Sequence, residues 1–304
     1  MPGVMRASGP RNAVWESDYY PTLSDADYFE GIGKAPYTHF ITGFLHVADG
    51  LALWFNDKPI EDLAVERHWD RCRKLQTNYA KKVVLGMGGW NSGSWARIQS
   101  GGPEQAAGVV AALVIKEGFA GVDVNFEGTY SDPGLLNAMA SFVVFLRTAL
   151  PNTDMALTPM YGQVGKQLDA IDTAAAAHGQ TWLDVLSCVN VQFYSYGGPS
   201  AYPMSDVADA FESLVGTHRL TRDKIGVGFP LEDLGTPRAE AFNTGEVQTA
   251  TGTLNNLVSA GGIAGAFVWH YQATKVPTDL QWAAKIAAAL DLVPAPPTNV
   301  RVIR

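Results

Sequence analysis

Three polar side chains alternate with apolar ones in the stretch Gly121–Glu127, whose sequence is Gly-Val-Asp-Val-Asn-Phe-Glu. Successive side chains of a β-strand point to opposite faces, so a strand here would carry Asp123, Asn125 and Glu127 on one face. A carboxyl group buried there must be hydrogen-bonded or neutralised, and a neighbouring carboxyl group and amide would keep Glu127 partly protonated. Because a general acid needs such a carboxyl group, the stretch predicts acid catalysis.

The same three side chains allow two other interpretations. One is an ordinary strand with a solvent-exposed polar face, and the other is a Ca²⁺ or Mg²⁺ site, since both ions prefer oxygen ligands. No further cluster of ligands accompanies the stretch, and the six histidines show no H-x-H or H-E-x-x-H spacing that would indicate zinc. No G-x-S-x-G sequence indicates a serine nucleophile. We therefore expect a site without a metal or a cofactor.

Short runs of β-branched and aromatic residues recur along the chain, mostly followed by segments with helical periodicity. The expected strands begin near Ala13, Tyr37, Lys82, Phe119, Met155, Leu186, Lys224 and Ala264. They begin on average about 36 residues apart, which is the length of one strand, one helix and their loops. The expected helices are Glu66–Tyr79, Pro103–Lys116, Leu135–Leu150, Ser205–Val215, Gly245–Ala260 and Leu280–Leu290. This alternation predicts an α/β protein with a single (β/α)8 TIM barrel, whose strands are covered on both faces.

An open, doubly wound sheet would also alternate strands and helices, with a nucleotide at its switch point. The run Gly86–Gly89 follows an expected strand, as a nucleotide-binding glycine loop does, but Asn91 stands where the third glycine of G-x-G-x-x-G would be. We therefore favour the barrel and assign it residues 13–290, with residues 1–12 as an N-terminal extension. Residues 291–304 are rich in proline, as expected of a C-terminal tail or a linker.

The 304-residue chain has 47% hydrophobic and 17% charged residues, the balance of a globular protein with a sizeable core. Its net charge is −8 and its lysines and arginines form no run, so we expect no nucleic-acid partner. No apolar stretch is long enough to predict a membrane span, and residues 1–6 lack the apolar segment of a signal peptide. A cytoplasmic protein and a secreted protein without its signal both fit. We expect a monomer, with Cys72 and Cys188 as buried free thiols.

Aromatic residues gather at or just after the carboxyl ends of the expected strands. They are Trp15, Trp90, Trp95, Tyr161, Tyr194, Tyr196 and Trp269, with the polar residues Glu16, Asn91, Gln163 and Gln192 beside them. In a (β/α)8 barrel these ends share one rim, where the sites of such barrels lie. A saccharide presents apolar ring faces and a border of hydroxyl groups, which aromatic platforms and short polar side chains match. The rim therefore predicts a sugar-binding site.

The stretch Ala120–Glu127 resembles the D-x-x-D-x-D-x-E motif of glycoside hydrolase family 18, the family of chitinases and endo-β-N-acetylglucosaminidases. The second aspartate of the motif matches Asp123 and the glutamate matches Glu127. Ala120 and Asn125 stand where the family has its first and third aspartates. The resemblance extends over about residues 13–290 and implies a (β/α)8 barrel with this motif on its fourth strand.

Three further motifs resemble the same family at the strands where they are expected. Gly86–Gly89 resembles the S-x-G-G turn after the third strand, with glycine in place of serine. Gln192–Tyr194 resembles the Q-x-Y of the sixth strand in plant-type and fungal class III members. Trp269 falls where the eighth strand of the family carries the tryptophan beneath the sugar at the cleavage point. Together the motifs imply a GlcNAc-containing saccharide as the partner.

The resemblance implies substrate-assisted, retaining hydrolysis of β-1,4-linked GlcNAc, as in chitin or chito-oligosaccharides. Glu127 would protonate the leaving oxygen while the 2-acetamido carbonyl group of the substrate attacks the anomeric carbon. Asp123, Asn125 and Tyr194 would complete the catalytic group. The substrate-binding residues would be Trp269, Gln192, Gly88, Gly89, Trp90, Tyr161, Met160 and Trp15.

Asn125 replaces an aspartate that in the family holds the acetamido N–H group and offsets the positive charge of the oxazolinium ring. The amide oxygen of Asn125 can still accept the N–H group, but it carries no charge. Two alternatives to an active chitinase therefore stay open. One is a weak or inactive chitinase-like lectin or storage protein, and the other is an endo-β-N-acetylglucosaminidase that acts on N-glycans.

Overall fold

The computed structural model describes residues 10–17, 25, 29–90, 92–127, 132–193, 206–230, 244–269 and 276–290. Asn91, Tyr194 and Tyr196, which the sequence places at the rim, lie outside these residues, as do residues 1–9 and 291–304. Within the described residues, no helix is both long enough and apolar enough to cross a membrane.

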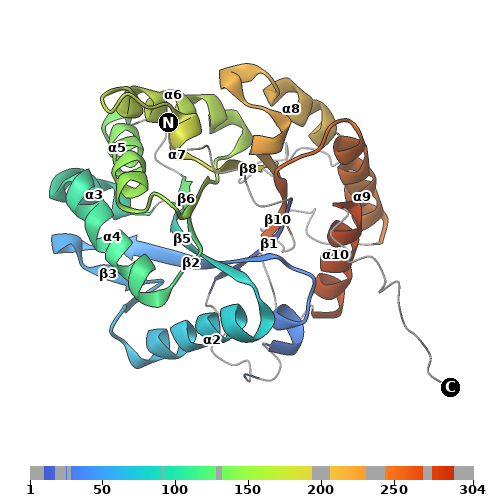
Figure 1. Cartoon of the computed structure of the whole chain (residues 1–304), viewed down its shortest axis with the longest axis horizontal. Helices are drawn as coiled ribbons and strands as arrows, with labels where there is room; N and C mark the ends of the chain where they lie inside the picture. Colours follow the sequence, from blue (N-terminus) through green and yellow to red (C-terminus); the bar gives the residue numbers. More distant parts are fainter. Residues whose placement is uncertain are drawn as a thin grey trace.

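Eight parallel strands of the described chain form a closed ring (Figure 1). They are β1 Arg11–Ser17, β2 His39–Val47, β5 Lys82–Gly89, β6 Gly121–Phe126, β7 Asp154–Leu157, β8 Cys188–Gln192, β9 Ile225–Pro230 and β10 Gly265–Trp269. Each strand pairs with the next one in this order, and β1 also pairs with β10, where Val14 lies beside Val268. The expected (β/α)8 barrel is confirmed, and the ring closure excludes an open, doubly wound sheet.

Helices surround the ring and connect its strands (Figure 1). They are α2 Leu63–Tyr79, α3 Ser94–Gly101, α4 Pro103–Glu117, α5 Pro133–Ala149, α6 Val164–Ala176, α7 Trp182–Val185, α8 Val207–Leu214, α9 Thr244–Ser259 and α10 Val276–Ala289. Asp62 accepts a hydrogen bond from the backbone N–H of Ala64 and so caps α2, and Asp132 caps α5 in the same way. The six expected helices are confirmed, with ends that differ by no more than four residues.

The structure contains several elements that the sequence did not predict. A short hairpin, β3 Leu53–Phe55 and β4 Lys58–Pro59, adds antiparallel to the end of β2. Its strands are too short for a period-2 pattern to show. Helices α3, α6 and α7 were also unexpected, as were the single helical turns at Phe29–Gly33, Asp49–Leu51, Tyr161–Gln163, Thr217–Arg219 and Arg222–Lys224.

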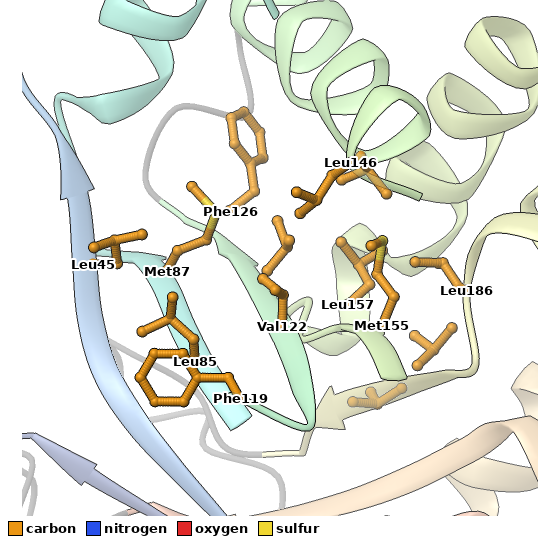
Figure 2. Close-up of a cluster of buried hydrophobic side chains, with 14 of the residues drawn as sticks. Leu45, Leu85, Met87, Phe119, Val122, Phe126, Leu146, Met155, Leu157 and Leu186 are labelled. Atoms are coloured by element: carbon orange, nitrogen blue, oxygen red, sulfur yellow. The ribbon is translucent and has the colours of Figure 1, made fainter. Parts of the chain in front are cut away.

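Apolar side chains fill two separate spaces in the barrel. The larger space lies between the strands and the helices, where Val122 and Phe126 of β6 point outward (Figure 2). The smaller space lies inside the ring and contains Ala13, Trp15, Ile41, Val84 and Phe267. Because side chains alternate along a strand, the residues between the outward-facing ones of β6 point into the ring. Asp123, Asn125 and the following Glu127 therefore face the interior, as the sequence predicted.

Candidate active site

Asp123 lies inside the barrel with its side chain fully buried. One carboxylate oxygen accepts a hydrogen bond from the hydroxyl group of Thr158, which follows β7, and the other accepts from Asn190 Nδ2 of β8 at 2.8 Å. Burial raises the pKa of Asp123 to about 6, although these two donors and the guanidinium of Arg11 act in the opposite direction. Asp123 therefore changes its charge near pH 6.

A positive charge lies below Asp123, toward the amino ends of the strands. Arg11 of β1 forms a partly buried ion pair with Asp154 of β7, with 2.6 Å between Nη2 and Oδ1. Asp154 is paired with Gly121, two residues before Asp123 on β6, so the ion pair occupies the next layer down. Within this layer Arg11 lowers the pKa of Asp123 and so favours its ionised form, whereas the like charge of Asp154 acts in the opposite direction.

Glu127 directly follows β6 and is buried at the carboxyl end of the strands. Gln192 of β8 donates a hydrogen bond from Nε2 to Glu127 Oε1 at 2.6 Å. Burial raises the pKa of Glu127, and the hydrogen bonds from Gln192 and Asn125 partly oppose this shift. Because Oε1 accepts from Gln192, the proton of the neutral acid belongs on Oε2.

Asn125 lies between the two carboxyl residues and is almost fully buried. Its Oδ1 atom is 3.5 Å from Gln192 Nε2, and its side chain also hydrogen-bonds Glu127. The neighbouring strand approaches it so closely that a Cβ atom on Gly88 would collide with the backbone oxygen of Asn125. Gly88 also has a φ of +101°, so both its backbone conformation and its surroundings require glycine.

Aromatic rings from three strands form a wall at the same end of the barrel. Trp269, at the end of β10, has its ring centroid 5.7 Å from that of Trp15 on β1 and 5.5 Å from that of Phe44 on β2. Trp15 is only 1% exposed. Its ring packs against Phe44 and Trp269 and is not exposed, so Trp15 cannot act as the stacking platform that the sequence suggested. Trp269 is partly exposed, and its role as a sugar platform stays a prediction.

Three residues of the site were not found by sequence reasoning. Asn190 could have been found, because Cys188–Gln192 alternates apolar and polar residues in the same way as β6. Thr158 comes directly after β7, and only the register of that strand places it beside Asp123. Phe44 is one of several apolar residues in β2, so period 2 alone cannot show which of them faces the interior.

The other aromatic residues expected at the rim differ in how far they are buried. Trp95 is fully buried outside the ring between Phe126 and Phe142, so the expectation that it lines the rim is wrong. Trp90 is 56% exposed. Tyr161 is half-buried, and its hydroxyl group is 2.7 Å from Ser213 Oγ of α8.

The backbone at Met160, between β7 and α6, forms an isolated parallel bridge with Gln192. The bridge connects the loop after β7 to β8, the strand whose Gln192 side chain hydrogen-bonds Glu127. Gly89, opposite Phe126 on β6, has a φ of +85°. A Cβ atom there would lie 3.3 Å from the ring of Phe44, so Gly89 leaves room for this part of the aromatic wall.

Glu16 was also expected at the rim, but it is buried behind the barrel wall. Its Oε2 atom lies 3.4 Å from Thr42 Oγ1 and 3.7 Å from His68 Nε2 of α2. Cys72 lies next to His68, with 3.6 Å between Sγ and Nε2. Both cysteines, Cys72 and Cys188, are buried and free, as the sequence predicted.

The site combines two buried carboxyl groups with raised pKa values, neutral amides and an aromatic wall. Two buried polar atoms at this site, Gln192 Oε1 and Trp15 Nε1, have no hydrogen-bond partner in the described part of the chain. Among the described residues, no group of three or more His, Cys, Asp and Glu side chains is arranged to hold a metal ion.

Solved structures with this fold include several from glycoside hydrolase family 18. A fungal endo-β-N-acetylglucosaminidase of family 18 is 19% identical, with a TM-score of 0.71 over 93% of this chain and 99% of that one. A GH18 chitinase from Pseudoalteromonas aurantia is 16% identical, with a TM-score of 0.69 over 91% and 99% of the two chains. The Cycas revoluta GH18 chitinase in complex with (GlcNAc)3 is 15% identical, with a TM-score of 0.66 over 92% and 98%. No protein-family model matches the sequence, and no curated protein is significantly similar to it.

The chain therefore has the (β/α)8 fold of the GH18 chitinases and endo-β-N-acetylglucosaminidases. This agrees with the resemblance that the motifs indicate. At these levels of identity the similarity shows the fold, and a fold hosts many functions. The chemistry of the site depends on the side chains that occupy it.

Proposed function

We propose that the chain is a glycoside hydrolase that cleaves β-1,4-linked GlcNAc in chitin or chito-oligosaccharides. The observation that carries the proposal is the position of Glu127, a buried carboxyl group with a raised pKa whose Oε1 is held by Gln192 Nε2 at 2.6 Å. A general acid must keep a proton near neutral pH and present it from a fixed direction. The raised pKa of Glu127 favours its protonated form, and the hydrogen bond from Gln192 holds the carboxyl group in one orientation.

The first step is proton transfer from Glu127 Oε2 to the glycosidic oxygen. The bond between that oxygen and the anomeric carbon breaks, and the leaving sugar departs as an alcohol. The carbonyl oxygen of the substrate's own 2-acetamido group forms a bond to the anomeric carbon on the opposite face. The product is a positively charged oxazolinium ion, so the chain needs no second carboxylate nucleophile.

The second step is attack of water on the same carbon. The ionised Glu127 takes a proton from the water as its oxygen bonds to the anomeric carbon, and the bond to the acetamido oxygen breaks. Glu127 is protonated again and ready for another cycle. Each step inverts the anomeric carbon, so the product retains the original configuration.

The other residues orient the substrate and stabilise the positive charge. Asn125 Oδ1 would accept the acetamido N–H group, and Asp123 would offset the charge from below with its carboxylate. Tyr194, which lies outside the described residues, takes the role that the resemblance implies. The contacts to the sugar are assigned to Trp269, Gln192, Gly88, Gly89, Trp90, Tyr161 and Met160, with Trp15 as the support of Trp269.

Two alternatives have an observation in their favour. Asn125 has no charge, which favours a protein that binds the saccharide without cleaving it, because a missing charge in a dry site can remove several kcal/mol of transition-state stabilisation. The similarity to a fungal endo-β-N-acetylglucosaminidase favours an N-glycan substrate. The buried acid Glu127 would serve that reaction equally well.

Electrophoresis of a fluorescent chitotetraose and of a high-mannose N-glycan after long incubation tests the proposal. We expect cleavage of chitotetraose that is lost in Glu127→Gln and kept in Glu104→Gln, a control at an exposed position on α4. Cleavage of the N-glycan alone would favour the endo-β-N-acetylglucosaminidase. Binding of chitotetraose without cleavage, measured by calorimetric titration, would favour the lectin. The absence of both cleavage and binding for both glycans would overturn all three.

A further inference from the structure

The end of β2 and the strand β3 carry a row of ring-bearing side chains beside the barrel mouth. Phe44 and His46 are two residues apart on β2, so they share one face of the strand. His46 is paired with Trp54 of β3 in the antiparallel register, which puts the two side chains on that same face. We call Phe44, His46 and Trp54 the hairpin face.

The hairpin face is continuous with the aromatic wall of the candidate site. The ring centroid of Phe44 is 5.5 Å from that of Trp269 and 6.4 Å from that of His46. Figure 1 shows β2 extending beyond the ring, with β3 alongside it. The row therefore leads from the platform under the proposed cleavage point to the outer edge of the barrel.

Trp54 is partly open to solvent while its neighbours in β3 hold the hairpin in place. It is 37% exposed, whereas Leu53 and Phe55 are buried, and Phe55 packs edge-on against Trp69 of α2. A tryptophan that was needed only for the core would be expected on the buried face of this strand. The anchored backbone presents the indole ring with little conformational freedom to lose on binding.

Polar atoms accompany the rings. His46 Nδ1 lies 3.2 Å from Ser92 Oγ, and His46 Nε2 has no hydrogen-bond partner among the described residues. Partial burial lowers the pKa of His46, so its ring is neutral at pH 7 and can donate or accept a hydrogen bond. Ring faces with a neutral polar group between them suit a saccharide better than a charged or purely apolar ligand.

We propose that the hairpin face binds additional sugar units of a saccharide whose other end occupies the pocket at Trp269. The proposal rests on the proposed function, because it extends the same GlcNAc-containing ligand along the barrel mouth. It makes Trp54 a residue that selects for chain length. Short oligosaccharides would fill the pocket alone, and longer ones would gain stacking on Trp54 and a hydrogen bond to His46.

Calorimetric titration with chitotriose and chitohexaose tests this length dependence, in a Glu127→Gln background that keeps the ligands intact. Trp54→Ala should weaken the binding of chitohexaose by about three- to tenfold, the effect of one lost aromatic contact, and change that of chitotriose less than about twofold. Trp54→Phe should restore most of the affinity for chitohexaose. Ile115→Ala, at an exposed apolar residue of α4, is the control and should change neither. Trp269→Ala should weaken both ligands.

Each outcome decides a different question. Equal affinity of Trp54→Ala and its parent for chitohexaose would overturn the hairpin proposal alone, as would an equal loss for both ligands. Unchanged thermal unfolding of Trp54→Ala would show that a loss is local. If neither ligand binds the parent, the hairpin proposal fails together with the proposed function.

Discussion

The indole ring of Trp15 occupies the space that a side chain at position 86 would need. A Cβ atom on Gly86 would lie 2.7 Å from Cη2 of Trp15 and 3.2 Å from the backbone oxygen of Thr42. Trp15 also contacts Phe44 and Trp269 in the aromatic wall. The glycine at the start of Gly86–Gly89, where the S-x-G-G turn has serine, is thus matched to a tryptophan on another strand.

Gly86→Ala should lower the free energy of unfolding by about 1–3 kcal/mol, because the new methyl group overpacks the interior against Trp15. The loss should be smaller in a Trp15→Ala background, where the ring is absent. Urea denaturation of the two single variants and the double variant measures this coupling. Gly108→Ala is the control, since a Cβ atom there meets nothing within 4 Å and alanine favours the helix α4. An equal loss in both backgrounds would contradict the pairing of Trp15 with Gly86.

Sequence reasoning located the strands and the polar face of β6 because both depend on local periodicity. Asp123, Asn125 and Glu127 share a face in any strand, whatever surrounds it. Which aromatic residues are exposed depends on packing between distant elements, so Trp95 was wrongly placed at the rim. The hairpin β3–β4 was missed because its strands of three and two residues are too short to show a period.

The raised pKa of Asp123 should make stability depend on pH. The pKa is about 6 in the native state and 3.8 for an ordinary aspartate, so between these values the native chain holds a proton that the unfolded chain has lost. The free energy of unfolding should therefore fall as the pH rises from about 4 to 6 through this group. Asp123→Asn should remove that fall in urea denaturation at a series of pH values. Asp57→Asn, at an exposed position, is the control and should leave the fall in place.

The ionisation of Asp123 should also affect how the rate of cleavage depends on pH. If the charge of Asp123 stabilises the oxazolinium ion, the acidic limb of the pH–rate profile should lie near pH 6. Asp123→Asn should lose this limb and be slower by about tenfold or more at pH 7, as expected for a missing charge in a dry site. An unchanged limb in Asp123→Asn would assign it to another group.

His68 should make the free energy of unfolding depend on pH in the direction opposite to that of Asp123. Burial lowers the pKa of His68 to about 3, with Thr42 Oγ1 at 2.6 Å and Glu16 Oε2 at 3.7 Å from its Nε2 atom. Below about pH 6.5 the unfolded chain gains a proton that the native chain excludes, so the free energy of unfolding should fall as the pH falls toward 3.

His68→Asn should make this fall shallower, even if it lowers stability at neutral pH by disturbing Thr42. Denaturant unfolding between pH 4 and 7 separates the slope from the offset. His178→Gln, at an exposed histidine of the chain, is the control and should keep the wild-type slope. The same slope in His68→Asn and wild type would show that His68 does not set the acid sensitivity.

Asn125→Asp should raise turnover and extend activity to higher pH. In the wild type, Asn125 hydrogen-bonds Glu127 and lowers the pKa of that acid. An aspartate would remove this stabilisation of the ionised form and add a like charge beside Glu127, and both changes raise the pKa of Glu127. Because the acid must hold its proton, the basic limb of the pH–rate profile should move upward. The new charge should also increase the rate by about tenfold or more by offsetting the oxazolinium ion.

The pH–rate profiles of wild type and Asn125→Asp with chitotetraose distinguish charge from orientation. A faster variant whose basic limb does not move would contradict the charge argument, because the added carboxylate would then act only by orienting the acetamido group. If neither the wild type nor Asn125→Asp cleaves chitotetraose, the defect would lie with Gly86 or Ala120, the other two positions that differ from the family motifs. If Asn125→Asp still binds chitotetraose without cleaving it, the lectin would be favoured. The sugar-binding pocket would then be intact, although neither Glu127 nor the new carboxylate at position 125 supports cleavage.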